Sequence, residues 1–224
     1  MRTQSEKWFE QFCEAQRILI SRIEESVSRM PDYSIELNGQ RIIVEVKEIQ
    51  PNAEERASIE KMRRTGVGSA VGGTPGERVR GKISDGNGQL KAITNGQLPS
   101  LLVLCDIRYG CGQISGHLDS YNIRVAMEGL DQVVFAVPRD PANSPYVVGT
   151  KSGPRKKMTE HQNTSISAIG VLYTPPDEPI GLIIYHNRFA AISLDPRILK
   201  GHVTEQFCLS SSVGTPSQWE RCEP

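Results

Sequence analysis

The chain has no excess charge of either sign. Its 224 residues include 26 lysines and arginines and 26 aspartates and glutamates, so the formal net charge is zero. A strong basic excess is typical of proteins that attract polyanions through their overall field, and this mode of binding is excluded here. Any contact with a phosphate backbone must therefore come from local clusters of positive charge.

Paired cysteines and long apolar runs are also scarce. The five cysteines form no CxxC pair and lack the spacing of a zinc finger. Their odd number and wide scatter predict thiols that behave as small apolar residues in a reducing compartment. No apolar run approaches the roughly 20 residues that span a bilayer, and the polar N-terminus does not resemble a secretion signal. We therefore expect a cytoplasmic protein with no membrane partner.

The order of the predicted elements indicates an α/β fold with a mixed β-sheet flanked by helices. An amphipathic helix is expected over residues 5–28, with Ser5 as its N-cap, and Pro31 prevents its continuation. A second helix is expected over 77–95, and residues 52–64 are expected to form a charged helical or frayed segment. Strands are expected over 32–37, 40–49, 100–106, 132–138, 165–173 and 180–186, and those over 100–106 and 132–138 are expected to be buried.

The length is sufficient for a buried core, so one domain is expected over 1–224, with its core at about 5–190. The glycine-rich stretch 66–76 and the stretch 139–164, rich in proline, glycine and lysine, are predicted to be flexible surface loops. The tail over 200–224 shows little periodicity and is predicted to lie outside the core.

The pair Asn38-Gly39 is the most informative local signal. It separates two runs of alternating apolar residues, and both central positions of a type I′ turn require a positive φ, which Asn and Gly adopt. A two-residue turn pairs Leu37 with Gln40. The residue numbers of every facing pair in this hairpin then add up to the same value, so the turn sets the register of the whole hairpin.

This register brings three ionisable side chains together. Asp32 falls opposite Glu45, and directly opposed Cβ atoms lie about 4.5–5.5 Å apart. Lys47 lies two residues beyond Glu45 and projects from the same face. Ile43 is the apolar exception on this face. The other face is expected to be buried and carries Tyr33, Ile35, Ile42, Val44 and Val46.

Facing carboxylates with an adjacent amine suit the hydrolysis of a phosphodiester. Carboxylate oxygens hold Mg²⁺, which binds a non-bridging phosphate oxygen and acidifies water. An ammonium group beside the cation orients the water or offsets charge in the transition state. Without a cation the two carboxylates repel each other. The plainer interpretation makes Asp32 a turn residue after Pro31, and Glu45 and Lys47 part of a solvated strand face.

The pattern Pro31-Asp32, a twelve-residue gap, and then Glu45-x-Lys47 resembles the PD-(D/E)XK, or restriction-endonuclease-like, superfamily. The resemblance covers about residues 5–106. It implies an α-β-β-β-α-β core, Mg²⁺ or Mn²⁺ as cofactor, and the cleavage of DNA or RNA. It also implies that Asp32 and Glu45 bind the metal and that Lys47 positions the attacking water.

The resemblance extends to both neighbouring helices. It implies a metal-ligating glutamate on the first helix, where Glu6 and Glu10 are the candidates and the sequence does not choose between them. It also implies a Gln or Lys on the helix after the motif, where Lys82 and Gln89 are seven residues apart and share one face. Glu6 and Glu10 are also compatible with exposed helix charges, and Lys82 and Gln89 with an ordinary surface face of their helix.

Basic residues near the glycine-rich stretch, Arg78, Arg80 and Lys91, are the candidate contacts to nucleic acid. The resemblance favours DNA over RNA as the partner. No separate recognition domain is evident, so a homodimer or a partner protein would supply specificity. Two alternatives stay open: a nucleic-acid-binding protein of the same fold without catalytic activity, and an unrelated α/β interaction module.

Overall fold

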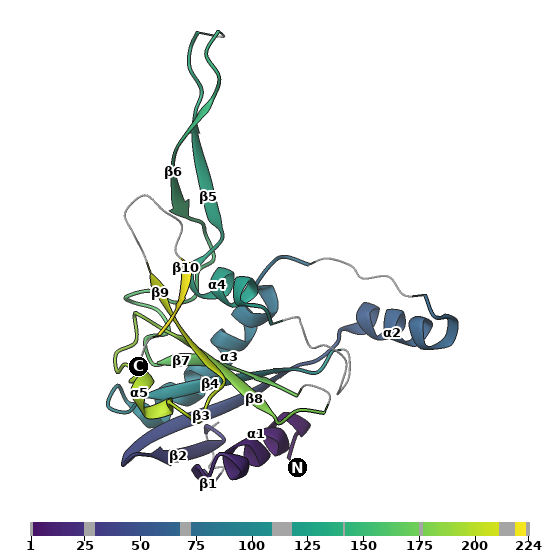
Figure 1. The fold of residues 1–224 in the computed structure, drawn as a ribbon, viewed down its shortest axis with the longest axis vertical. Helices are drawn as coiled ribbons and strands as arrows, with labels where there is room; N and C mark the ends of the chain where they lie inside the picture. Colours follow the sequence, from purple (N-terminus) through teal and green to yellow (C-terminus); the bar gives the residue numbers. More distant parts are fainter. Residues whose placement is uncertain are drawn as a thin grey trace.

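The computed structural model describes residues 2–24, 30–67, 73–108, 118–140, 142–174, 177–210 and 218–222. It shows an α/β fold with a mixed sheet flanked by helices, as predicted (Figure 1). The elements are α1 Gln4–Ala15, β1 Leu19–Arg22, β2 Tyr33–Leu37, β3 Gln40–Ile49, α2 Ala53–Thr65, α3 Glu77–Thr94, β4 Ser100–Asp106, α4 Ser120–Glu128, β5 Asp131–Ala136, β6 Tyr146–Ser152, β7 Ala168–Tyr173, β8 Gly181–His186, α5 Pro196–Leu199, β9 Glu205–Ser210 and β10 Gln218–Arg221.

The main sheet has the strand order β1-β2-β3-β4-β7-β8-β9-β10. Strands β1, β2 and β3 are antiparallel neighbours, whereas β4 runs parallel to both β3 and β7. Helices α1 and α5 pack on one face of the sheet, and α3 and α4 pack on the other. Each face therefore has its own apolar core, with the central strands between them.

The hairpin register is confirmed. Leu37 pairs with Gln40 and Tyr33 with Val44, around a turn in which Asn38 has φ 50° and Gly39 has φ 76°. The face of β3 that carries Ile43 is covered by α3, and Ile43 is fully buried. The charged segment over 52–64 and the predicted helix over 77–95 correspond to α2 and α3.

The long N-terminal helix was predicted wrongly. Helix α1 ends at Ala15, and the chain then turns through Arg17, which has φ 55°, into strand β1. Ile18 is buried, Leu19 is exposed and Ile20 packs against the core, which is the alternation of a strand, and β-branched isoleucines favour that conformation. The N-cap is Thr3, whose side chain accepts from the Glu6 amide, and not Ser5.

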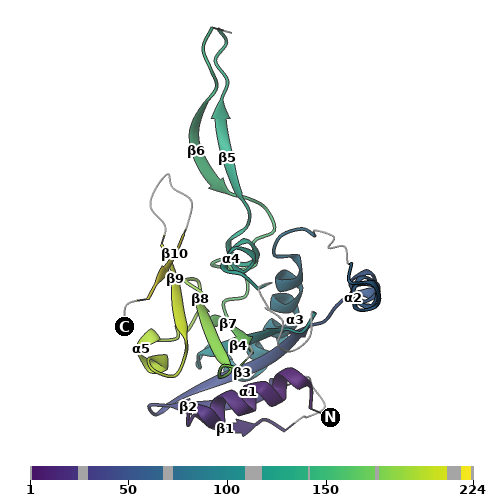
Figure 2. The same ribbon diagram turned by 45° about the vertical axis from the view of Figure 1, so that its right-hand side comes forward.

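The expected buried strand over 132–138 is exposed. It corresponds to β5, which pairs with β6 in a separate two-stranded sheet that projects from the body (Figures 1 and 2). Strand β6 lies within 139–164, which was predicted to be a loop. Apolar β-branched residues fit an exposed ribbon as well as a buried strand, so composition alone did not separate them.

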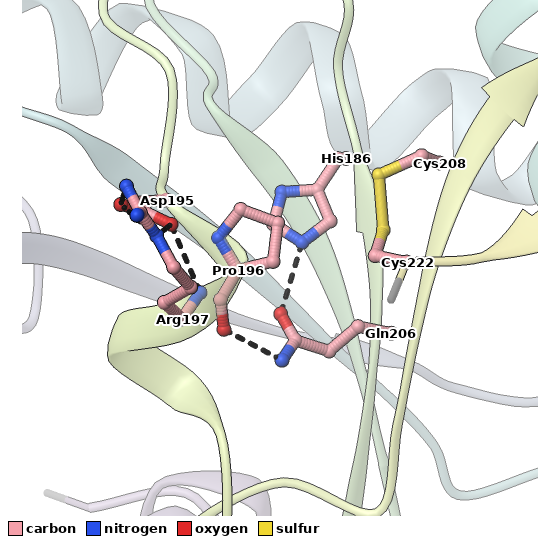
Figure 3. Close-up of a disulfide and its surroundings, with 7 residues drawn as sticks. All are labelled: His186, Asp195, Pro196, Arg197, Gln206, Cys208 and Cys222. Atoms are coloured by element: carbon pink, nitrogen blue, oxygen red, sulfur yellow. Dashed lines mark hydrogen bonds and ion pairs between the residues drawn. A yellow bond between two sulfur atoms is a disulfide. The ribbon is translucent and has the colours of Figure 1, made fainter. Parts of the chain in front are cut away.

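The C-terminal tail is part of the sheet, in contrast to the prediction. Strands β9 and β10 form one edge, and a disulfide joins Cys208 to Cys222 across them (Figure 3). This corrects the expectation that all cysteines are thiols in a reducing compartment. Cys13 and Cys105 are buried thiols, as expected, and Cys111 lies outside the described residues. Within the described chain, none of the helices has both the length and the apolar character required to cross a membrane.

Removing this disulfide should lower stability. The bond closes a sequence separation of 14 residues, and the chain-entropy estimate for such a loop is about 3 kcal/mol. The double replacement Cys208→Ser and Cys222→Ser should therefore reduce the free energy of unfolding by about this amount, measured by urea denaturation under oxidising conditions. A reductant should destabilise the wild type and leave the double variant unchanged. Identical unfolding curves for the wild type and the double variant under oxidising conditions would contradict a disulfide between Cys208 and Cys222.

Candidate metal centre

A cleft of about 530 Å³ opens where the N-terminus of α1, the second half of β3 and the buried side of α3 meet. It is lined by six of the residues predicted for the site, together with several that the sequence did not single out. The predicted ones are Glu6, Asp32, Glu45, Lys47, Lys82 and Gln89. Arg78, predicted to contact nucleic acid, and Ser5 and Glu48 also line it.

The two central carboxylates lie in a partly dehydrated setting. Asp32 immediately precedes β2, and its Oδ2 accepts a hydrogen bond of 2.8 Å from the Val46 amide, which fixes it against β3. Glu45 is 1% exposed, and its Oε2 has no hydrogen-bond partner. Burial, followed by the charge of Asp32, raises the pKa of Glu45 to about 7. Burial also raises the pKa of Asp32.

Lys47 is held at the cleft from two sides. Its Nζ forms an ion pair with Glu45 Oε1 and donates a hydrogen bond of 2.8 Å to Gln89 Oε1. The Gln89 amide in turn donates to the carbonyl oxygen of Met30, at 2.9 Å. Gln89 is therefore held at both its oxygen and its nitrogen, and it orients the amine. The sequence predicted that Lys82 and Gln89 share one face of this helix, and both line the cleft, but it did not predict the contact of Gln89 with Lys47.

Helix α3 approaches the sheet closely beside Glu45 because of a glycine. A Cβ on Gly86 would lie 2.7 Å from Leu102 Cδ1 and 3.7 Å from Glu45 Cγ. A side chain at this position would have to displace the Leu102 side chain of β4. The glycine thus allows Gln89, one turn further along α3, to reach Lys47.

The structure distinguishes the two glutamates of the first helix. Glu6 is buried, lines the cleft, and accepts from Arg22 at 3.1 Å and from the Thr3 amide at 2.6 Å. Glu10 is one turn further along α1, outside the cleft lining. It accepts from the Tyr33 hydroxyl at 2.8 Å and pairs with Arg2. Both carboxylates already pair with an arginine, so their positions alone distinguish them: Glu6 lines the cleft and Glu10 does not.

Glu48 was missed by the sequence reasoning. Its Oε1 accepts from both the amide and the hydroxyl of Ser5, each at 3.0 Å, so it ties the start of α1 to β3. Burial opposes the charged form, but the hydrogen bonds from Ser5 and Gln50 outweigh it and lower the pKa of Glu48. Its position directly after Lys47 of the motif was the only sequence signal that could have pointed to it. Glu48 positions the helix that carries Glu6.

Of the basic residues predicted to contact nucleic acid, only Arg78 is at the cleft. It donates to the Gln50 carbonyl at 3.0 Å and pairs with Glu55 of α2. Arg80 is buried where α3 begins, close to α4, and pairs with Glu77. Its proposed contact to a phosphate is not supported, because its guanidinium group is turned into the protein. Lys91 is exposed on α3 but lies outside the cleft lining.

A second group of potential metal ligands lies at the far edge of the sheet (Figure 3). Ligand atoms of His186, Cys208 and Cys222 are within 4.8 Å of one another. The two sulfurs are bonded to each other, however, and His186 Nε2 is hydrogen-bonded to Gln206 at 3.0 Å. Neither sulfur is a thiolate in this state, so the group is not a metal centre.

No protein-family model, curated protein or solved structure matches this chain. The evidence for a function therefore comes from the geometry of the cleft and from the motif within it.

Proposed function

We propose that this chain is a metal-dependent nuclease that hydrolyses phosphodiester bonds of nucleic acid, with DNA as the favoured substrate. One observation carries the proposal. A buried carboxylate, Glu45, has an oxygen without a partner, and it stands beside Asp32 and a fixed amine, Lys47.

The residues of the cleft fit a hard divalent cation. Buried polar atoms normally have partners, and the unpartnered Glu45 Oε2 is an exception that a cation would remove. Burial raises the pKa of both Glu45 and Asp32, and the charge of a neighbouring carboxylate raises it further, Asp32 in the case of Glu45 and Glu6 in the case of Asp32. A divalent cation reverses both effects. Oxygen ligands without sulfur or imidazole are typical of Mg²⁺ or Mn²⁺, and Glu6 would complete the set.

The roles of the chain's own groups follow from their contacts. Asp32, Glu45 and Glu6 would hold the cation, whose positive charge would polarise a phosphodiester and acidify water. Lys47 Nζ orients the attacking water and offsets the negative charge that develops on the phosphate oxygens. Gln89 restricts the Lys47 side chain to the rotamer that faces the cleft.

The order of elements also supports the proposal. The chain runs α1, β1, β2, β3, α3, β4, which is the order α-β-β-β-α-β implied by the resemblance to PD-(D/E)XK nucleases, with α2 inserted before α3. The carboxylates and the amine come from β3 and the residue before β2, as in the motif. Neither the order of the elements nor the motif distinguishes DNA from RNA as the substrate, so the preference for DNA comes from the resemblance alone.

A nucleic acid would be met by positive charge at the cleft rim. Arg78 and Lys82 line the cleft, and α2 follows directly from β3. Helix α2 has no buried side chain, and its last turn carries Arg63 and Arg64. Such groups are suited to phosphate contacts in a protein whose net charge is zero.

The proposal is tested by incubating the protein with supercoiled plasmid and Mg²⁺. Cleavage is expected with Mg²⁺ and not with EDTA, and the variant Asp32→Ala should be inactive. Glu36→Ala is the matched control, because Glu36 is an exposed carboxylate on the same hairpin, at its other end. Binding of DNA by the wild type without cleavage in Mg²⁺ or Mn²⁺ would favour a nucleic-acid-binding protein that lacks catalysis.

The two glutamates of α1 provide a further test. Replacing Glu6 with glutamine should weaken Mn²⁺ binding about tenfold or more, because a carboxylate at the cleft loses its charge. Glu10→Gln should leave the affinity almost unchanged, since Glu10 faces Tyr33 and Arg2. Titration calorimetry compares the two variants, and an equal effect of both would show that Glu6 has no special place in the site.

A further inference from the structure

The β5–β6 ribbon is the most exposed apolar feature of the described residues. It extends away from the sheet and helices in both views (Figures 1 and 2). Seven large apolar side chains on it are 38% to 75% exposed: Val133, Val134, Phe135, Val137, Tyr146, Val147 and Val148. A monomeric soluble protein seldom displays a contiguous apolar patch of this kind without a partner.

The register of the ribbon gathers four of these side chains into a stripe. Along β5, Val133 and Phe135 share one face, because alternate residues of a strand point the same way. Val147 lies opposite Phe135 on the neighbouring strand. Val137, just beyond β5, continues the series. Together Val133, Phe135, Val137 and Val147 form the ribbon stripe.

The ribbon is poorly suited to nucleic acid. Residues 131–152 contain only four charged side chains, two acidic and two basic, so their net charge is zero. Asp131 at the base is already paired with Arg124, at 2.6 Å. A surface that binds a phosphate backbone needs several basic groups along its length. The chemistry of the ribbon favours an apolar protein surface.

We propose that the ribbon is a dimerisation arm and that its partner is the ribbon of a second copy of this chain. The seven exposed side chains offer on the order of 600 Å² over the two faces of the ribbon together, against the roughly 800 Å² that each partner buries in a stable dimer, so most of the apolar surface of the ribbon has to take part in the contact. A neutral arm meets no charge repulsion from an identical arm. Two-fold pairing places the ribbon stripe of one copy on that of the other.

The structure of the ribbon itself adds a reason for such pairing. An isolated two-stranded ribbon is marginally stable in water, because neither face is covered and both edges have unpaired backbone groups. Contact between two ribbons covers the apolar stripe on each. The inference is independent of the proposed nuclease activity, since no residue of the cleft takes part.

Sedimentation equilibrium of the full chain over a wide range of protein concentration tests the proposal. The wild type should form a dimer. The double variant Phe135→Ser and Val147→Thr should raise the dissociation constant about a hundredfold or more, because it removes apolar area from both sides of the contact. Leu19→Ser is the matched control, since Leu19 is a 70% exposed apolar residue on β1, and it should leave the dimer unchanged.

Circular dichroism of the double variant should match that of the wild type, because both altered side chains are exposed. A wild type that is monomeric at every concentration would overturn the proposal. So would a dimer whose dissociation constant is the same in the double variant as in the wild type.

Discussion

Lys47→Ala should lower the rate of phosphodiester cleavage by about 10²–10³-fold, the usual cost of removing one positioned group that stabilises developing charge. The amine also holds down the pKa of its neighbour, because its hydrogen bond and charge favour ionised Glu45. Without it, the pKa of Glu45 should rise further. The variant should therefore need a higher pH than the wild type to reach half of its own maximal rate.

The rate profile with pH in saturating Mg²⁺ measures both effects. Lys200→Ala is a suitable control, because Lys200 is an exposed lysine after α5, outside the cleft lining. A Lys47→Ala protein that cuts DNA at the wild-type rate would remove the amine from the mechanism. A lower rate with an unchanged pH profile would show that Lys47 acts on the reaction but not through Glu45.

Glu45→Gln should make the metal-free protein more stable near neutral pH while abolishing cleavage. In the folded protein burial and the charge of Asp32 raise the pKa of Glu45 to about 7, from an ordinary value of 4.5. The folded state thus keeps a proton that the unfolded chain releases between these two values. The stabilising contribution is present below pH 4.5 and is lost as the pH rises through about 7.

Above that window the wild type contains a buried charge, and glutamine does not. One unit of pKa corresponds to about 1.4 kcal/mol, so the rise from 4.5 to about 7 predicts that the variant gains on the order of 3 kcal/mol in unfolding free energy at about pH 8. Urea denaturation without metal, compared at about pH 5 and about pH 8, tests this. The difference between the two proteins should shrink at the lower pH, and a variant that is less stable at the higher pH would contradict the proposed strain at Glu45.

A stabilising substitution that destroys activity is the expected mark of a functional site. Paired carboxylates in a dehydrated cleft lower the stability of the chain, and a purely structural role for Glu45 gives no reason to retain them. Mg²⁺ should restore stability to the wild type by binding only the folded state, and it should have little effect on Glu45→Gln.

The central residues of the site, Asp32, Glu45 and Lys47, could be predicted from the sequence because local interactions determine their positions. Asn38-Gly39 adopts the two positive φ values of a tight turn, and this fixed the pairing of β2 with β3 without any knowledge of the rest. This register brought Asp32 to Glu45, and the alternation of side chains along β3 put Lys47 on the same face as Glu45. Helix α3 was also predictable, because its apolar residues recur with helical spacing.

Other features depend on contacts between distant segments, and sequence patterns do not specify them. Glu6 and Glu10 lie one turn apart on the same side of α1, so the sequence does not distinguish them. Only the packing of α1 against β3 brings Glu6 to the cleft. Arg80 is a basic residue close to a glycine-rich stretch, which suggested a phosphate contact, but the approach of α4 buries it. The pairing of Cys208 with Cys222 required β9 and β10 to be neighbours, which weak periodicity in the tail did not indicate.

The most direct test of the account is a calorimetric titration of Mn²⁺ into the wild type and into Asp32→Asn, in buffers of different ionisation enthalpy. The account predicts saturable binding by the wild type, with protons released at about pH 6.5 because Glu45 is then largely protonated, and with little release at about pH 8. Asp32→Asn should lose this binding. Binding that is unchanged in Asp32→Asn, or no binding by the wild type with or without DNA, would contradict the central claim.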